Sequence, residues 1–369
     1  MSDAAAPYAR LTPHQMLDAV AAAGFEVTGG LLQLNSYENR VVQIALEGAG
    51  RPAVVAKFYR PGRWSDAQIL EEHAFALELA AADLPVVAPL PLQPWREEPA
   101  LQLAGDPPTL GHWQADAGLP IDEGAPAADA GSSAAWPPYR FAVSPRRAGR
   151  APELESPHTL AWLGRLLGRL HAVGARQPFR HRHTLDTRRF GHEARARVQA
   201  SGALDLNVES MWLDLSARAI DAAEQAFAAA GAVASIRLHG DCHPGNILWR
   251  DEGEDAGPLF VDLDDACMGP AVQDLWMLLS GEPEAMQAQL GHVLGGYRAF
   301  MPFNPAELAL IEPLRTLRMI HHSAWLADRW ADPAFPVAFP WFGTPNYWQQ
   351  QMTQLREQLE AMAQPPLRA

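Results

Sequence analysis

The chemistry of this chain centres on one polar loop, His239-Gly-Asp-Cys-His-Pro-Gly-Asn246. Within it, Asp241 and Asn246 have the H-x-D-x-x-x-x-N spacing of loops that catalyse phosphoryl transfer. In such loops the carboxylate faces an acceptor hydroxyl, and the amide oxygen reaches a phosphate-bound metal ion. Asp262 follows the apolar pair Phe260-Val261, and a carboxylate at the end of a buried strand suits Mg²⁺, which prefers hard oxygen ligands. The pattern predicts Asp241 and Asp262 as catalytic residues, and Asn246 and Asp262 as ligands of Mg²⁺.

A lysine in an apolar strand supplies the next element. Lys57 lies in Val54-Val-Ala-Lys-Phe-Tyr59, where an unpaired ammonium would be costly to bury. In this V-A-I-K-like setting it can bridge nucleotide phosphates and a carboxylate on the following helix. Glu72 is the preferred partner, and Glu71 stays open as the alternative. A lysine that extends along an edge strand into solvent is the competing interpretation.

The usual glycine-rich phosphate loops are missing. Neither G-x-x-x-x-G-K-[ST] nor G-x-G-x-x-G precedes the lysine strand, and Leu34-Asn-Ser-Tyr-Glu-Asn-Arg40 stands in that place. A tight turn there could hold phosphate oxygens with backbone N–H groups and the hydroxyl of Ser36, although Asn-Ser is also an ordinary hairpin turn.

Each of these signals alone also fits a polar turn or a strand cap. Their order along the chain, each polar group after a short apolar strand, favours the catalytic interpretation. A metal hydrolase would need several histidine ligands, and His239 and His243 have no partners at ligand spacing.

Composition sets the class of protein. The chain has 369 residues, 48% of them hydrophobic, and a formal charge of −14. This is a globular composition, and its acidity argues against a chain-wide nucleic-acid binder. Two cysteines, Cys242 and Cys267, exclude a disulfide framework, and we see no secretory signal or membrane span. We expect a reduced, soluble, cytoplasmic protein without a nucleic-acid or membrane partner.

Hydrophobic periodicity predicts an α+β protein with two lobes. The alternating pattern in the front half predicts strands, and leucines at helical spacing in the back half predict helices. We expect a nucleotide-binding lobe with a small antiparallel sheet over residues 1–143, and a larger, mainly helical catalytic lobe over 144–369. Residues 105–138, rich in Gly, Ala, Pro, Ser and Asp, are predicted to form a flexible insertion. The predicted strands are Leu31–Leu34, Arg40–Leu46, Ala53–Tyr59, Tyr139–Val143, Ser235–Leu238 and Pro258–Val261, and the predicted helices are 13–23, Ile69–Asp83, Thr159–Val173, Met211–Ala230 and Pro305–Trp330.

Taken together, the motifs resemble the bacterial stress response kinase A family, also called RdoA or YihE. The resemblance runs from about Leu11 to Pro366. The stretches that carry it are Leu34–Arg40, Lys57–Pro61, Ile69–His73, Leu238–His243, Gly245–Arg250, Phe260–Ala266, Gly269–Trp276 and Arg329–Pro336. It implies a protein-kinase-like fold of the aminoglycoside phosphotransferase and choline kinase type. It also implies a monomeric, cytoplasmic, ATP- and Mg²⁺-dependent serine/threonine protein kinase linked to stress and survival.

The resemblance also implies roles for single residues. Asp241 would be the catalytic base, Ser36 would lie at the ATP site, and Lys57 would touch the phosphates. Asp274 would be a buried carboxylate that braces the catalytic loop. The insertion at 105–138 departs from the family pattern but leaves these positions untouched.

Two other functions compete with a protein kinase. One is a kinase for a small hydroxylated molecule of the aminoglycoside, choline or homoserine type, because this fold does not determine its substrate. The other is a non-catalytic ATP sensor or scaffold, which the presence of Lys57, Asp241, Asn246 and Asp262 disfavours. The sequence leaves open autophosphorylation and control by oxidation of Cys242, which lies beside the predicted base.

Overall fold

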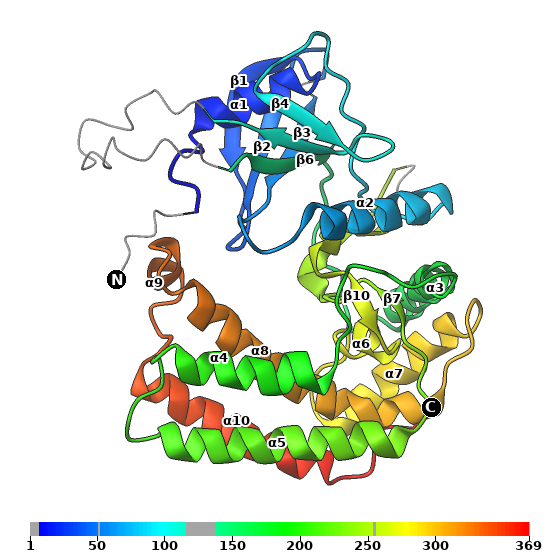
Figure 1. Ribbon diagram of the computed structural model, residues 1–369. Helices are drawn as coiled ribbons and strands as arrows, with labels where there is room; N and C mark the ends of the chain where they lie inside the picture. Colours follow the sequence, from blue (N-terminus) through cyan, green and yellow to red (C-terminus); the bar gives the residue numbers. More distant parts are fainter. Residues whose placement is uncertain (1–6, 51, 116–136, 254–255, 369) are drawn as a thin grey trace. The chain divides into compact units, whose positions relative to one another are not determined.

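The structure is a computed structural model that describes residues 7–50, 52–115, 137–253 and 256–368. The chain divides into two compact units, the first over 1–77 and 87–147, the second over 78–86 and 148–369. Figure 1 shows that the first unit carries a β-sheet and that the second carries most of the helices.

An antiparallel sheet of six strands forms the first unit, in the order β1-β2-β3-β6-β5-β4. Alternate residues of the central strand β3 are buried, as a sheet with one covered face requires. The elements are α1 (Pro13–Ala22), β1 (Val27–Gln33), β2 (Arg40–Leu46), β3 (Ala53–Phe58), α2 (Asp66–Ala81, which ends in the second unit), β4 (Leu101–Ala104), β5 (Leu110–Trp113) and β6 (Tyr139–Pro145).

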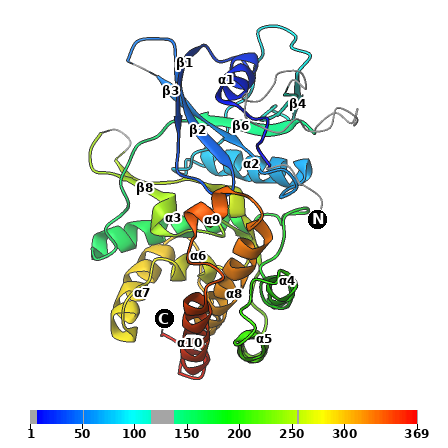
Figure 2. The ribbon, with the colours of Figure 1, turned by 90° about the vertical axis from the view of Figure 1, so that its left-hand side faces the viewer.

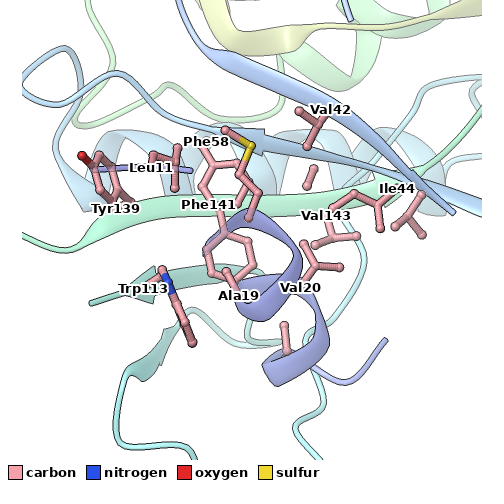
Figure 3. Packing of buried hydrophobic residues seen from close by; sticks show 14 of the residues in the cluster. Leu11, Ala19, Val20, Val42, Ile44, Phe58, Trp113, Tyr139, Phe141 and Val143 are labelled. Carbon is pink, nitrogen blue, oxygen red and sulfur yellow. The ribbon is translucent and has the colours of Figure 1, made fainter. Parts of the chain in front are cut away.

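Helix α1 covers one face of this sheet. Thr12 caps its start by accepting a hydrogen bond from the backbone N–H of Gln15, and a proline follows at the first helical position. Ala19 and Val20 are fully buried against strand residues that include Phe141, as Figure 3 shows. The apolar side chains of α1 therefore form part of the core of the first unit, together with side chains of the sheet.

The predicted start of the flexible insertion, residue 105, lies too early in the chain, because an ordered strand follows it. Residues 110–113 form β5, which pairs with both β4 and β6, and the Leu110 side chain is fully buried. Pairing with β4 just before it and with β6, which lies more than twenty residues further along the chain, stabilises this short segment despite its glycine- and proline-rich surroundings. The rest of the predicted insertion, residues 116–136, lies outside the described residues.

The second unit is mainly helical, with two short strand pairs, β7 with β10 and β8 with β9. Figures 1 and 2 show its long helices α5, α8 and α10, which share one apolar core. Its elements are α3 (Pro157–Gly174), the π-helical turn η1 (Arg188–Glu193), α4 (Ala194–Ala200), α5 (Glu209–Ala230), β7 (Ile236–Leu238), the 3₁₀ turn η2 (Pro244–Asn246), β8 (Ile247–Arg250), β9 (Gly257–Phe260), the 3₁₀ turn η3 (Leu263–Asp265), β10 (Cys267–Gly269), α6 (Val272–Trp276), α7 (Pro283–Tyr297), the 3₁₀ helix η4 (Pro305–Leu310), α8 (Ile311–Arg329), α9 (Ala334–Ala338) and α10 (Pro345–Met362).

The predicted α+β class is confirmed: an antiparallel sheet is followed by a largely helical part. One predicted helix, Pro305–Trp330, is two elements, because its first turn is the 3₁₀ helix η4 and α8 begins only at Ile311. In the part of the chain that the structure describes, no helix has the length and apolar character needed to cross a membrane.

Helices α3 and α7 approach closely because glycines lie at their contact. A Cβ added to Gly164 of α3 would lie 2.0 Å from the carbonyl oxygen of Val293, and one added to Gly296 of α7 would lie 2.0 Å from that of Ala161. Any larger side chain at these positions would force the helices apart.

We predict opposite effects for two glycine-to-alanine substitutions in this helix pair. Gly164→Ala should lower the free energy of unfolding by about 1–3 kcal/mol, because overpacking displaces a backbone. Gly291→Ala in α7, where an added Cβ meets nothing within 4 Å, should raise it by up to about 1 kcal/mol through helix propensity. Denaturant unfolding of both variants measures this, and an equally stable Gly164→Ala variant would contradict the close contact.

Candidate active site

Two short strand pairs in the second unit hold the predicted catalytic loop. β7 leads directly into the loop 239–246 and pairs with β10, whereas β8 leaves the loop and pairs with β9. The backbone N–H of Val261, just after β9, donates a hydrogen bond of 3.0 Å to the carbonyl oxygen of Asn246. The segment that contains Asp262 therefore lies alongside the loop.

Side chains join the same two segments. The Asn246 Nδ2 atom donates to the backbone oxygen of Asp241 at 3.0 Å and lies 3.5 Å from its Oδ2 atom. The buried His239 ring donates from Nε2 to the carbonyl oxygen of Val261 at 3.0 Å. The structure thus brings together Asp241, Asn246 and Asp262, the three predicted site residues of this unit.

Asp241 is half-buried between cationic and polar partners. Its Oδ1 atom lies 2.6 Å from Nη1 of Arg318, and its Oδ2 atom lies 3.5 Å from Nε2 of His243. Burial alone would raise the pKa of Asp241, but the hydrogen bond from His243 and the charge of Arg318 hold it well below its usual range. The carboxylate is therefore ionised and can accept a hydrogen bond from a hydroxyl group.

Arg318 was not among the predicted site residues. It lies on α8, and nothing in the local sequence relates this helix position to Asp241. Only the folded chain brings the two side chains together.

Asp262 has an unusual backbone conformation. Its φ of 60° and ψ of 66° are in the left-handed region, which few residues other than glycine adopt, although Asp tolerates it better than most. Such strain persists where the surrounding structure imposes it, often at functional sites. The side chain is exposed immediately before η3, so the backbone turn presents this carboxylate at the surface of the unit.

These residues fit a hard divalent cation. The amide nitrogen of Asn246 is engaged within the loop, which directs its Oδ1 oxygen away from Asp241. Asp262 adds a carboxylate from the adjoining segment. Mg²⁺ in phosphoryl-transfer enzymes takes one or two such protein oxygens and completes its shell with phosphates and water.

A fully buried carboxylate braces the loop, as predicted. Asp274 of α6 accepts hydrogen bonds from the backbone N–H of His239 at 2.8 Å and of Gly240 at 2.9 Å. Nε2 of His171 donates to the same carboxylate at 3.0 Å, and Nδ1 of His171 lies 3.0 Å from the hydroxyl oxygen of Tyr297. The sequence-based prediction missed His171, although its place after the buried leucines of α3 could have identified it.

The neighbouring residue of α6 holds the other side of Gly240. Nε2 of Gln273 donates to the Gly240 carbonyl oxygen at 3.0 Å, and Nε1 of Trp276 donates to Oε1 of Gln273 at 3.1 Å. Gly240 has a φ of +85°, and a Cβ there would lie 2.2 Å from the carbonyl oxygen of Asp265. Only glycine fits this turn, which sets the direction of the loop toward Asp241.

The first unit contains the other predicted site residues. Lys57 lies opposite Val41 and Ala142 in the sheet, on the face away from α1, and is half-buried. Ala142 belongs to an apolar cluster that includes Ile69 of α2, less than one turn before Glu72. Lys57 and α2 therefore share one side of the sheet. Glu72 is only 7% exposed, its Oε2 atom lies 3.8 Å from Nε2 of the adjacent His73, and its pairing with Lys57 stays a prediction.

The turn between β1 and β2 carries Ser36. Its Oγ atom accepts a hydrogen bond of 3.4 Å from the backbone N–H of Asn39, which leaves the hydroxyl proton available for donation. Oδ1 of Asn39 accepts a hydrogen bond from the backbone N–H of Arg60 at 3.0 Å. Because Arg60 follows β3, this bond connects the turn to the end of the strand that carries Lys57.

Cys242 is a poor candidate for redox control. Its side chain is fully buried, and burial raises the pKa of the thiol well above its usual value, with the charges of Asp274 and Asp241 acting in the same direction. Oxidants react with exposed thiolates, so this geometry argues against the oxidation hypothesis.

The chain is similar to known phosphotransferases over most of its length. A model of the phosphotransferase enzyme family matches residues 30–311. The chain is 39% identical over 367 residues to stress response kinase A of Escherichia coli (strain K12), covering 100% of this chain and 98% of that protein. It has the same identity and coverage to the serine/threonine protein kinase RdoA of Salmonella typhimurium.

Solved structures share the fold at low sequence identity. The amicoumacin kinase hAmiN, in complex with AMP-PNP, Ca²⁺ and Ami, has a TM-score of 0.66 at 17% identity, covering 98% of this chain and 96% of that one. A microcompartment-associated aminopropanol kinase has a TM-score of 0.63 at 16% identity, covering 94% and 96%. At these identities the likeness concerns the fold alone.

We predict that Asp274→Asn loosens the loop. An amide can accept from the loop but turns its own N–H₂ group toward one of the two backbone donors, which loses its partner in a buried site. The free energy of unfolding should fall by about 1–3 kcal/mol, and the amide protons of His239 and Gly240 should exchange faster. Asp221→Asn on the exposed side of α5 is the control. If Asp274→Asn matches the unsubstituted protein and the control in stability and in amide exchange, Asp274 does not brace the loop.

Proposed function

The chain belongs to the phosphotransferase enzyme family and, within it, to the stress response kinase A family, and from this membership we propose an ATP- and Mg²⁺-dependent serine/threonine protein kinase of a bacterial stress response. The observation that carries the proposal is the joined pair of segments around Asp241, Asn246 and Asp262. One carboxylate held beside an amide and a second carboxylate suits the alignment of a hydroxyl with a bound triphosphate.

In the proposed reaction Asp241 acts on the acceptor hydroxyl. The ionised carboxylate accepts the hydroxyl hydrogen bond, aligns the oxygen with the γ-phosphorus and takes its proton. A bond forms between the hydroxyl oxygen and the γ-phosphorus, while the bond from the γ-phosphorus to the bridging oxygen breaks. ADP leaves with that electron pair.

The first unit is proposed to bind the nucleotide. Lys57 orients the phosphates from the half-buried face of β3, and Glu72 of α2 is its proposed partner. Ser36 donates its hydroxyl proton to a phosphate oxygen from the β1–β2 turn. These are positioning roles, because phosphoryl transfer is catalysed mainly by alignment and charge neutralisation.

Asn246 and Asp262 are proposed to hold Mg²⁺. When bound, the ion neutralises charge on the triphosphate. The strained backbone of Asp262 and the internal hydrogen bond of Asn246 orient both oxygens before the ion arrives, so little reorganisation is required.

The acceptor is proposed to be a protein hydroxyl, including one of this chain in autophosphorylation. The support is the name of the Salmonella typhimurium relative, a serine/threonine protein kinase, at 39% identity over the whole chain. The solved structures with this fold are named as kinases of amicoumacin and aminopropanol, at 16–17% identity, which keeps a small hydroxylated acceptor as the alternative.

Labelled ATP tests the reaction and the acceptor together. Incubation of the purified protein with γ-labelled ATP should label a generic protein substrate or the protein itself, and Asp241→Ala should reduce the rate by about 10²–10⁴-fold. Nucleotide binding should change little, because Asp241 acts on the acceptor. Asp221→Ala is the control. Full activity of Asp241→Ala contradicts the mechanism, and label found only on small hydroxylated compounds assigns the alternative.

Metal dependence tests the two proposed ligands. Chelation with EDTA should stop transfer, and added Mg²⁺ should restore it. Asp262→Asn removes a charge from the ion's shell and should raise the Mg²⁺ concentration for half-maximal rate by about tenfold or more. Asp251→Asn, an exposed carboxylate after β8 that pairs with Arg150, is the matched control. An unchanged Mg²⁺ requirement in Asp262→Asn would remove this residue from the metal site.

A further inference from the structure

The proposed mechanism gives Arg318 no role, yet its guanidinium forms an ion pair with Asp241, the proposed catalytic base. Its Nη1 atom lies 2.6 Å from Oδ1 of Asp241, an oxygen that an acceptor hydroxyl could use. The ion pair holds the Arg318 side chain at one end, and because the side chain is 44% exposed, the rest of it contacts solvent. An acceptor must therefore share Asp241 with Arg318 or displace it.

Arg318 begins a stripe of cationic and aromatic side chains along α8. Arg318, His322, Trp325 and Arg329 follow at helical spacing on one face. The ring of His322 stacks on Trp325 at 5.6 Å between centroids, and the guanidinium of Arg329 lies 5.2 Å from the centre of the same ring. Figure 1 shows α8 extending along the second unit toward α9.

Positive charge is concentrated around this stripe, although the whole chain carries −14. Burial lowers the pKa of His321 to about 3, and four arginine charges act in the same direction. Those arginines are Arg197, Arg189, Arg329 and Arg318. Arg197 and Arg318 are both paired with carboxylates: Nη1 of Arg197 lies 2.7 Å from Asp328, and Nη1 of Arg318 lies 2.6 Å from Asp241. An anion placed near Arg318 would experience a favourable potential.

We propose, as an extension of the protein-kinase function above, that Arg318 and the other stripe residues of α8 bind an anionic group next to the acceptor hydroxyl. The favoured substrate would then be a serine or threonine in an acidic segment. A carboxylate or phosphate on the substrate draws the guanidinium from Asp241 and exposes Oδ1 to the hydroxyl. Arg318 exchanges one anionic partner for another, whereas a neutral substrate must break the ion pair without replacing it.

The length of the stripe limits where the anions lie. From residue 318 to residue 329 an α-helix rises about 16 Å, which an extended peptide spans in about five residues. Acidic residues within about five positions of the acceptor are therefore within reach of the stripe.

Peptide kinetics test the inference. Four serine peptides, identical except for flanking Asp/Glu, phosphoserine, Asn/Gln or Lys/Arg, are compared as acceptors for the full-length protein. We expect kcat/KM to be about tenfold or more higher for an anionic flank than for the Asn/Gln flank. The first two peptides distinguish a carboxylate from a phosphate as the anion, and a preference for either supports the inference. Equal rates for anionic and neutral flanks overturn it.

Variants assign the preference to Arg318. Arg318→Gln should bring the ratio of anionic to neutral kcat/KM close to one, and Arg318→Glu should reverse it toward the Lys/Arg flank. Arg315→Gln, one turn earlier on α8 and paired with Glu312 at 3.1 Å, should keep the original ratio. A preference that survives both Arg318 substitutions contradicts the assignment.

A binding measurement separates this inference from the function on which it rests. The same peptides with alanine in place of the acceptor serine are titrated by fluorescence anisotropy. Tighter binding of the acidic peptide that depends on Arg318, without transfer to the serine peptides, keeps the anionic site and refutes the protein-kinase function. Transfer with no effect of charge on binding or rate refutes the anionic site and keeps the function.

Discussion

The arrangement of the catalytic loop depends on the hydrogen bonds of one buried carboxylate. Asp274 has no exposed surface, so its charge is tolerable only if its oxygens accept strong hydrogen bonds. Two of its donors are backbone N–H groups of the loop itself, His239 and Gly240, and a third is the His171 ring. Satisfying this carboxylate therefore fixes the start of the loop, and the positive φ of Gly240 turns the chain so that Asp241 follows in a defined direction.

Beyond that brace, the site is organised by charge. Asp241 stays ionised because His243 and Arg318 outweigh the cost of its partial burial. Asp262 is held in a strained left-handed conformation in the segment that lies alongside the loop. Arg318 supplies a cation beside Asp241, and we propose that Mg²⁺ binds beside Asp262.

The sequence predicted what is encoded locally. Alternation in β3, the leucine stripe of α3 and the loop 239–246 were each identified from neighbouring residues. The bracing role of Asp274 was implied by a family resemblance and is confirmed by its hydrogen bonds. Contacts between distant residues were missed: β5 pairs with β6, which lies more than twenty residues further along the chain, and Arg318 reaches Asp241 from α8. Periodicity carries no information about such pairs, because they arise only from the folded topology.

A crystal structure with a non-hydrolysable ATP analogue and Mg²⁺ tests the central claim most directly. We predict the Asn246 amide oxygen and an Asp262 carboxylate oxygen at about 2.0–2.1 Å from the ion, with Asp241 facing the γ-phosphate and not ligating the metal. An ion bound to the phosphates but held by other side chains, with Asn246 and Asp262 outside its coordination shell, would contradict the account.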